Sequence, residues 1–297
     1  MRLAFVTNNA SRPPRAVATH LSGLGIPADA SEVITSAQAA AHYLADRLPP
    51  GSRVLVVGTT GLVEALTERG LVPVSSADDD PAAVVQGYSA DTDWRMLAEG
   101  AVAICRGLPW IATNLDATVP SPRGPLPGNG SLVAALQHAT GVTPTATGKP
   151  DPTMHRETVE RSGARSPLVV GDRLDTDIEG ANAVGCASLL VLTGVTAPTE
   201  LLGAPEVHRP GYVARDLGGL LAAHPAPVET EGRFACGAWA VTVRRDQLHL
   251  AGASGESVDS GLDALRALCV AAWASSVTTC VADDGAAASA LADLGLG

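Results

Sequence analysis

The chain has 297 residues and a mass of 30.0 kDa, enough for about two domains or for one domain with a large insertion. Hydrophobic residues make up 46% of it and charged residues 17%, a balance that excludes an intrinsically disordered protein. The net charge of −11 disfavours general nucleic-acid binding, and it means that phosphate would have to be handled through a cation.

Short apolar runs alternate with segments of helical periodicity along most of the chain. Strands are predicted at Leu3–Val6, Arg53–Val57, Ala83–Gln86, Trp110–Thr113, Leu168–Val170 and Ser188–Leu192. Helices are predicted at Pro13–Leu24, Ala37–Leu48, Gly61–Arg69, Trp94–Arg106, Ser131–Ala139, Pro152–Ser162 and Asp177–Val184. This alternation indicates an α/β fold, a Rossmann-like parallel sheet with helices on both faces.

The pattern changes after a proline-containing linker, Pro225-Ala226-Pro227. A hairpin of two strands is predicted at Trp239–Val243 and Gln247–Leu250, followed by a helix at Gly261–Ser275 and a strand at Thr278–Ala282. We expect a small, separate α+β module over 228–297. It has no evident acyl-CoA phosphate loop, so packing or formation of a homodimer is its expected role.

The cysteines and the N-terminus bear on the cellular compartment. The five cysteines are far apart and include no C-x-x-C pair, which predicts buried free thiols in a reducing cytoplasm. Leu3–Val6 is too short an apolar run for a signal peptide, and no apolar stretch is long enough to cross a membrane. We therefore expect a cytoplasmic protein without a membrane partner.

An acidic loop follows one of the predicted strands. Gly171 ends an apolar run, and Asp172, Asp175 and Asp177 come within the next six positions. Ligands of open α/β sheets bind at the carboxyl ends of the strands, and clustered carboxylates repel one another unless a hard cation such as Mg²⁺ lies between them. The alternative is an acidic turn that caps the next helix, a role that suits Asp177 best.

Two further segments could contact an anion. Lys149 lies between Gly148 and Pro150, on a constrained loop that could direct its ammonium group, although a surface lysine is the simpler interpretation. The run Val6–Ser11 delivers a hydroxyl group and backbone N–H groups at the end of a strand. Such a turn can hold phosphate, or it can be a plain polar turn.

Taken together, these segments resemble the haloacid dehalogenase-like (HAD) hydrolase superfamily. Thr7-Asn8 matches its second motif, Lys149 its third, and Asp172 with Asp177 its fourth. The runs VTNNAS, PGNGS, GKP and GDRLDTDIEGAN resemble class IIA, which carries a C2-type cap and includes p-nitrophenylphosphatase-like, phosphoglycolate and pyridoxal phosphatases.

The resemblance implies a domain arrangement and a set of roles. It implies a HAD core at 1–29 and 146–224 with the cap at 30–145, and hydrolysis of a small phosphorylated metabolite, with glycerol 3-phosphate as one candidate. Thr7 and Lys149 would act in catalysis, and phosphate or substrate would contact Thr7, Asn8, Asn9 and Lys149. The metal Mg²⁺ would be held by Asp172 and Asp177. On the cap side Asn114 and Asp116 are candidate substrate contacts, with turn formation as the alternative.

The chain departs from the family at the first motif. An Asp-x-Asp on the central strand should precede VTNNAS by one β-α unit, and a βαβ unit takes about thirty residues. Only six residues precede Thr7. In the family the first aspartate attacks phosphorus to form an aspartyl-phosphate and the second protonates the leaving group. We therefore expect a start codon placed too late, and a chain that is inactive as written.

Other functions remain as alternatives. A catalytically inactive phosphate-binding pseudoenzyme predicts the same residues in this chain. A dinucleotide-dependent oxidoreductase is suggested by Val54–Gly61, but the G-x-G-x-x-G pattern is incomplete there. A phosphoacceptor receiver domain would place its acidic pair first, whereas Thr7 precedes Lys149 and Asp172 here.

Overall fold

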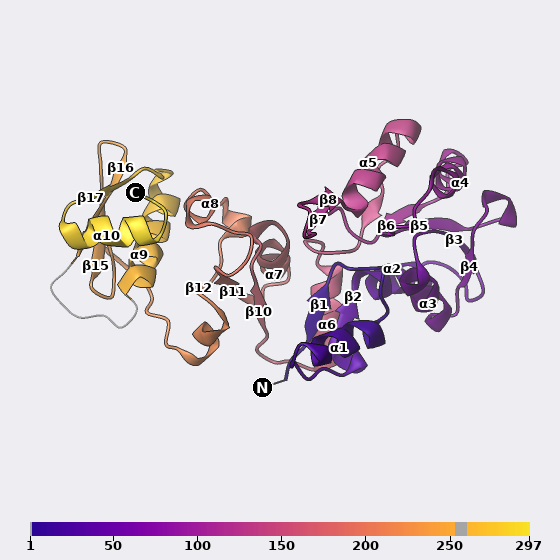
Figure 1. Ribbon diagram of the computed structural model, residues 1–297, viewed down its shortest axis with the longest axis horizontal. Coiled ribbons are helices and arrows are strands. Elements are labelled where there is room, and N and C mark those ends of the chain that lie inside the picture. Colours follow the sequence, from indigo (N-terminus) through magenta and orange to yellow (C-terminus); the bar gives the residue numbers. More distant parts are fainter. Residues whose placement is uncertain (1, 253–259) are drawn as a thin grey trace. The chain divides into compact units, whose positions relative to one another are not determined.

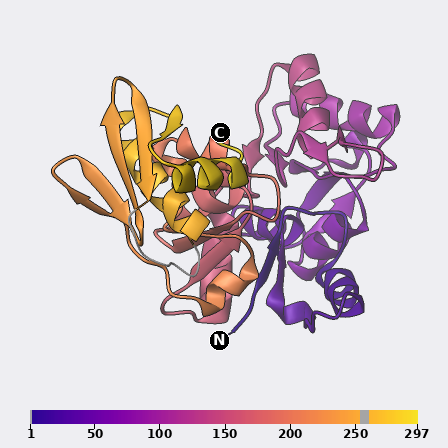
Figure 2. The same ribbon diagram turned by 60° about the vertical axis from the view of Figure 1, so that its left-hand side comes forward.

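The structure is a computed structural model, and it describes residues 2–252 and 260–297. Contacts between Cα atoms divide the chain into two compact units, residues 1–165 and 166–297. Each unit contains sheets of its own, drawn in Figures 1 and 2. The mixed α/β architecture predicted from the sequence is confirmed.

The first unit begins with a pair of short parallel strands. β1 (Phe5–Thr7) pairs with β2 (Val33–Thr35), and α1 (Pro14–Gly23) lies between them in the sequence. The helix α2 (Ser36–Ala45) starts with a capping box in which the Thr35 hydroxyl accepts the Gln38 N–H and the Gln38 side chain accepts the Thr35 N–H. The helix α6 (Thr153–Ser162) packs against β1, β2 and α2.

A five-stranded parallel sheet forms the rest of this unit. Its strand order is β4 (Val72–Val74), β3 (Arg53–Val57), β5 (Ala83–Gln86), β6 (Trp110–Ala112) and β9 (Thr145–Ala146). Helices α2 and α3 (Thr60–Glu68) share an apolar cluster with β3 and β5. Helices α4 (Trp94–Cys105) and α5 (Asn129–Thr140) share another. A small hairpin, β7 (Thr118–Val119) and β8 (Leu126–Pro127), precedes α5.

The sheet pairing bears on where the cap begins. β2 lies inside the range 30–145, yet it pairs with β1 and belongs to a different sheet from β3–β9. The helix α2, which follows β2 directly, ends at Ala45 and is succeeded by Pro49-Pro50. We propose that the cap starts after this proline pair, and that 33–45 belongs with the core.

The second unit holds two sheets. β10 (Leu168–Gly171), β11 (Ala187–Val191) and β12 (Tyr212–Ala214) are parallel. A π-helical turn, Leu174–Ile178, precedes α7 (Glu179–Ala183). The helix predicted over Asp177–Val184 is therefore shorter as an α-helix, and its first two residues belong to the π-helical turn. The helix α8 (Pro198–Leu202) follows β11 in the sequence.

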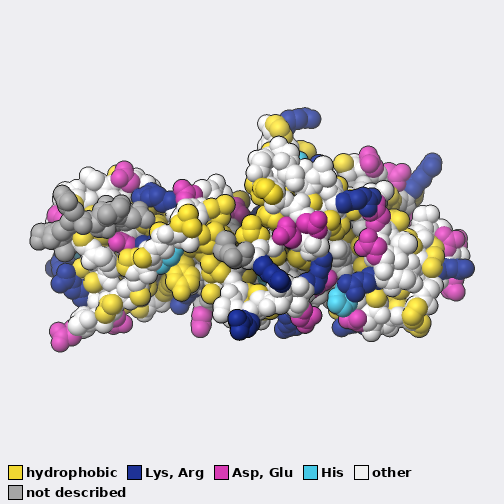
Figure 3. Space-filling model, turned by 90° about the horizontal axis from the view of Figure 1, so that it is seen from below, with side chains coloured by type: hydrophobic (Ala, Val, Ile, Leu, Met, Phe, Trp, Pro, Cys, Tyr) yellow, Lys and Arg dark blue, Asp and Glu magenta, His cyan; other side chains and the backbone are white. Residues whose placement is uncertain are grey.

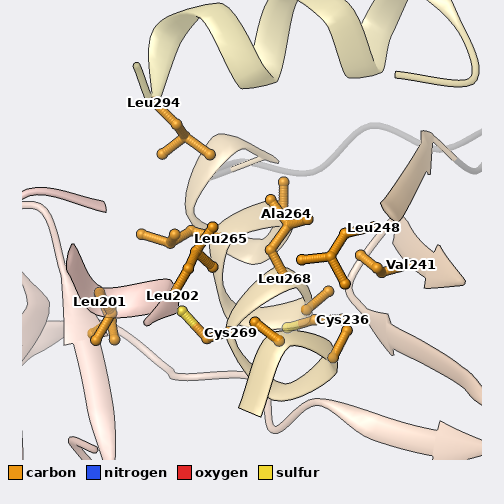
Figure 4. Close-up of a cluster of buried hydrophobic side chains, with 14 of the residues drawn as sticks. Leu201, Leu202, Cys236, Val241, Leu248, Ala264, Leu265, Leu268, Cys269 and Leu294 are labelled. Atoms are coloured by element: carbon orange, nitrogen blue, oxygen red, sulfur yellow. The ribbon is translucent and has the colours of Figure 1, made fainter. Parts of the chain in front are cut away.

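The predicted C-terminal α+β module is present and has more strands than expected, and it shares one compact unit, residues 166–297, with β10–β12. Its sheet runs β13 (Val228–Thr230), β14 (Arg233–Cys236), β15 (Trp239–Arg244), β16 (Gln247–Gly252) and β17 (Cys280–Ala282), with only the last pair parallel. Two helices complete it, α9 (Ser260–Ser275) and α10 (Gly285–Asp293). Leu265 and Leu268 of α9 lie among the buried side chains in Figure 4, where Leu248 comes from the sheet and Leu201 from α8.

All five cysteines are free, but the prediction that all are buried is wrong. Cys105, the last residue of α4, is exposed, and Cys186 and Cys280 are half-buried. Burial raises the pKa of the thiols of Cys236 and Cys280 to about 11, with the Asp263 carboxylate adding to the shift at Cys236.

The thiols of Cys236 and Cys280, whose pKa values are raised, should show low reactivity until the protein unfolds. Since the thiolate is the nucleophile, Cys105 is expected to react with iodoacetamide at about pH 8 while Cys236 does not. The raised pKa of Cys236 stabilises the folded state below the ordinary thiol pKa of 9.0, and this contribution is lost as the pH rises toward 11. Mass spectrometry after labelling in native buffer and in urea tests this. Equal labelling of Cys105 and Cys236 in the native protein would contradict it.

Candidate active site

Asn8 joins three segments that are far apart in the sequence. Its side-chain Nδ2 donates to both carboxylate oxygens of Asp116, at 3.3 and 3.2 Å, and to the Lys149 carbonyl at 3.1 Å. Its Oδ1 accepts the Lys149 backbone N–H at 2.8 Å. The end of β1 is therefore fixed to the loop after β6 and to the loop before α6.

The main chain of Asn8 is held as firmly as its side chain. The Asn8 carbonyl accepts from the buried Asn114 amide at 2.8 Å and from the Ser36 hydroxyl at 2.6 Å. Asn114 also accepts the Asp116 N–H through its Oδ1 at 3.1 Å, which is the turn-forming role weighed from the sequence. The sequence did not identify Ser36 as a residue of this site. Its position in the first turn of α2, directly after the capping residue Thr35, is the feature that could have indicated it.

Lys149 lies beside the strand that carries Thr7. Its ammonium Nζ donates to the Val6 carbonyl at 3.2 Å. The preceding Gly148 is required by space, because a Cβ atom there would overlap the Thr113 carbonyl oxygen and lie 2.8 Å from the Asn8 Oδ1. The positive charge is thus held at the carboxyl end of β1, where a parallel sheet binds its ligands.

The remaining residues of this loop arrange its backbone. The Thr7 hydroxyl accepts the Asn9 N–H at 3.1 Å, and Asn9 Oδ1 accepts both the backbone N–H of Ser11 at 2.8 Å and the Ser11 hydroxyl at 2.7 Å. The structure thus brings all six predicted residues of the first unit into one region: Thr7, Asn8, Asn9, Asn114, Asp116 and Lys149.

The acidic loop lies in the second unit, at the carboxyl end of β10. A carboxylate oxygen of Asp172 accepts the Val195 N–H at 2.9 Å, and a Cβ atom on Gly194 would overlap that carboxylate. Asp177 is 7% exposed and accepts the Arg173 N–H at 3.2 Å, while a Cβ atom on Gly171 would overlap its side chain. Gly171 therefore leaves space for the side chain of Asp177, and Gly194 leaves space for that of Asp172.

Asp175 has a different environment on the same loop. Its two carboxylate oxygens accept from the Arg173 guanidinium at 3.0 and 2.7 Å. These hydrogen bonds hold the pKa of Asp175 below its usual range. Asp175 is committed to Arg173, whereas Asp172 and Asp177 fit a site for a hard cation by the chemistry of their oxygen atoms.

Asp172 and Asp177 do not make a complete metal cage. Among the residues that the structure describes, no group of three or more His, Cys, Asp or Glu side chains is arranged to hold a metal ion. Mg²⁺ characteristically keeps several waters and binds through one or two carboxylates plus substrate phosphate. Two carboxylates on one loop fit that type of coordination.

Charged side chains of both signs lie on the surface of the protein. Lys and Arg side chains are scattered among Asp and Glu on the face drawn in Figure 3, as is typical of a solvated surface. Over residues 2–252 and 260–297, no helix combines the length and the apolar character needed to cross a bilayer.

Comparison with protein families gives three matches. Residues 1–72 match a family of haloacid dehalogenase-like hydrolases, and residues 146–220 match a second HAD-hydrolase-like family. Residues 236–296 match a GCN5-related N-acetyltransferase-like domain, which covers most of the C-terminal module.

The chain is similar to known phosphatases over most of its length. It is 49% identical over 281 residues to D-glycerol 3-phosphate phosphatase of Mycobacterium tuberculosis, covering 92% of this chain and 77% of that protein. It is 37% identical to the acid sugar phosphatase of Staphylococcus saprophyticus, covering 72% and 81%.

Solved structures agree with this similarity. The glycerol phosphate phosphatase of M. tuberculosis in complex with magnesium matches with a TM-score of 0.90 and 46% identity, over 100% of this chain and 88% of that one. The p-nitrophenyl phosphatase of Archaeoglobus fulgidus matches with a TM-score of 0.67 and 32% identity, over 74% and 85%.

Proposed function

Because this chain belongs to the haloacid dehalogenase-like hydrolases, we propose that it serves as a Mg²⁺-dependent phosphatase of small phosphate monoesters. The observation that carries this proposal is the Asn8 network, which holds Lys149 at the end of β1, the strand that carries Thr7. Glycerol 3-phosphate is the first substrate to test, since a relative of 49% identity is named for it.

The loop from Thr7 to Ser11 would bind the phosphoryl group. The Thr7 hydroxyl can donate to a phosphate oxygen while it accepts the Asn9 N–H, because a hydroxyl does both. The Lys149 ammonium has three donors, so it can keep its bond to the Val6 carbonyl and screen phosphoryl charge with another.

Asp172 and Asp177 would hold Mg²⁺ at the carboxyl end of β10. When bound, the ion neutralises the charge of the phosphoryl oxygens. The protein's contribution is to orient both carboxylates: the Val195 N–H donates to Asp172, and the Arg173 N–H donates to Asp177.

We propose that the attacking aspartate of the family mechanism is not among residues 1–297. No aspartate precedes Thr7, and the first one in the sequence is Asp29. Asp175 is paired with Arg173, and Asp177 is buried on the acidic loop. We propose that the active enzyme takes the attacking aspartate from residues encoded upstream. The alternative, a catalytically inactive phosphate-binding protein, predicts the same residues in this chain.

The substrate side of the site would be formed by the loop after β6. Asn114 and Asp116 carry polar groups to Asn8. The Asp116 carboxylate is held beside Asn8, and carboxylate oxygens accept from hydroxyl groups such as those of a polyol phosphate. We propose this residue as the cap-side contact for the leaving group.

A binding experiment tests the metal site without depending on turnover. Asp172→Asn is expected to weaken Mg²⁺ binding about tenfold or more, because it removes a charged oxygen ligand and loss of even an outer partner costs 10–100-fold. Asp175→Asn is the matched control: it removes a charge from the same loop, yet its carboxylate is committed to Arg173. Titration calorimetry with MgCl₂ gives both affinities. Equal losses in the two variants would contradict the assignment.

A further inference from the structure

The cap sheet has a topology that normally creates a ligand site. Its strand order β4-β3-β5-β6-β9 corresponds to the order 2-1-3-4-5 of flavodoxin-like sheets, and all pairs are parallel. In such sheets the ligand binds where the winding reverses, at the carboxyl ends of the first and third strands. Here these are β3 and β5, and β3 ends in the glycine-containing turn Gly58–Gly61.

The chain itself occupies this position. A Cβ atom on Gly61 would overlap the Ala10 carbonyl oxygen and would lie 3.0 Å from the Ser11 carbonyl carbon and 3.1 Å from the Arg12 nitrogen. Ala10 is 1% exposed and belongs to the apolar cluster of α3 and β3. A Cβ on Gly87, just beyond β5, would lie 3.1 Å from the Ala10 Cβ.

A hydrogen bond reinforces this close approach. The hydroxyl of Thr59, the residue before α3, donates to the Ser11 carbonyl at 3.0 Å. Gly61 lies in the first turn of α3, where alanine would favour the helix more than glycine does. The space required by Ala10 and Ser11 accounts for glycine at this position.

The contact bears directly on the phosphate-binding residues. Ala10 and Ser11 follow Asn8 and Asn9 in the chain, and the Ser11 N–H and hydroxyl both donate to Asn9 Oδ1. The Thr7–Ser11 loop is therefore fixed at one end by β2 and the Asn8 network, and at the other by α3. Any displacement of Ala10 is transmitted to the backbone N–H groups of Asn8 and Asn9.

We propose that Gly61 is a positioning residue for the phosphate-binding loop, and that Thr59 assists it through the Ser11 carbonyl. This inference rests on the proposed function for the identity of the ligand. The docking of the Thr7–Ser11 loop onto α3 does not depend on the proposed function, because it follows from the contacts of Gly61 and Thr59. The motif that resembles a nucleotide-binding turn thus acts as a support for a neighbouring loop.

The test compares Gly61→Ala and Thr59→Val with two controls. Gly23→Ala adds the same methyl group at a helical glycine with no heavy atom within 4 Å, and Thr59→Ser keeps the hydroxyl. Hydrogen exchange of the peptide 7–12 reports docking, and titration with inorganic phosphate in the presence of Mg²⁺ reports the ligand site.

We expect Gly61→Ala to speed exchange in 7–12 and to weaken phosphate binding about tenfold to 10²-fold, because small misplacements of binding groups are costly. Thr59→Val should weaken it about two- to tenfold, the value of one hydrogen bond. Gly23→Ala and Thr59→Ser should match the wild type. Unchanged exchange and affinity in Gly61→Ala would overturn the proposal. Absence of phosphate binding by the wild type would overturn the proposed function instead, and exchange alone would then decide the docking.

Discussion

A form of this protein extended upstream to include an Asp-x-Asp motif is expected to release phosphate from glycerol 3-phosphate about 10⁶ times faster than residues 1–297 do. Removal of a nucleophile that acts together with its partners has a cost of this size in other hydrolases. Thr7 and Lys149 would still bind the phosphoryl group in the shorter chain, so the difference should lie in kcat rather than in phosphate affinity.

The measurement is phosphate release from a panel of monoesters that includes glycerol 3-phosphate, a sugar phosphate and p-nitrophenyl phosphate, with Mg²⁺ and with chelator. The control is the extended form in which the first aspartate of its motif is replaced by asparagine, which should fall to the level of residues 1–297. Robust Mg²⁺-dependent release by residues 1–297 would defeat the prediction. The nucleophile would then have to be sought among Asp116, Asp175 and Asp177.

Arg266→Met is expected to lower the free energy of unfolding of the second unit by about 3–5 kcal/mol, the cost of breaking a buried ion pair. Arg266 is 8% exposed, and its Nη1 donates to Asp263 at 2.6 Å, one turn away on α9. Its Nη2 donates to the Val213 carbonyl at 2.8 Å and contacts the His224 ring nitrogen at 3.1 Å. One side chain therefore connects α9 to β12 and to His224, the residue before the Pro225-Ala226-Pro227 linker.

Most of the expected loss comes from what the substitution leaves behind. The Asp263 carboxylate is 4% exposed and would lose its ion pair with Arg266, and the Val213 carbonyl would lose a donor. The double variant Arg266→Met with Asp263→Asn should recover part of the stability, because it also removes the buried negative charge. Urea unfolding followed by circular dichroism measures these changes. Arg233→Met, at an exposed site, is the control and should change stability by less than about 0.5 kcal/mol. A similar small effect at Arg266 would contradict the argument.

The sequence by itself determines those strands and helices whose local residue pattern favours a single type of secondary structure. The predicted strands Arg53–Val57 and Ala83–Gln86 match β3 and β5 residue for residue, because continuous apolar runs between turn residues suit a strand buried on both faces. The strands β2, β13 and β14 are not predicted from the sequence, and their pairing with a neighbouring strand is what identifies them as extended.

The family motifs likewise identified the candidate site residues without indicating what holds them. Thr7, Lys149 and Asp172 follow from the motif order, because each chemical role requires a particular side chain. Only the tertiary structure shows what holds them. Asn8 forms hydrogen bonds to residues 108 and 141 positions away in the sequence. Gly61 of α3 leaves space for Ala10, which lies in the loop after β1. Hydrogen bonds and close contacts between distant segments depend on where the backbone is placed, and local sequence does not encode that placement. For this reason the turn Gly58–Gly61 resembles a ligand site in sequence, whereas in the folded chain it supports the Thr7–Ser11 loop.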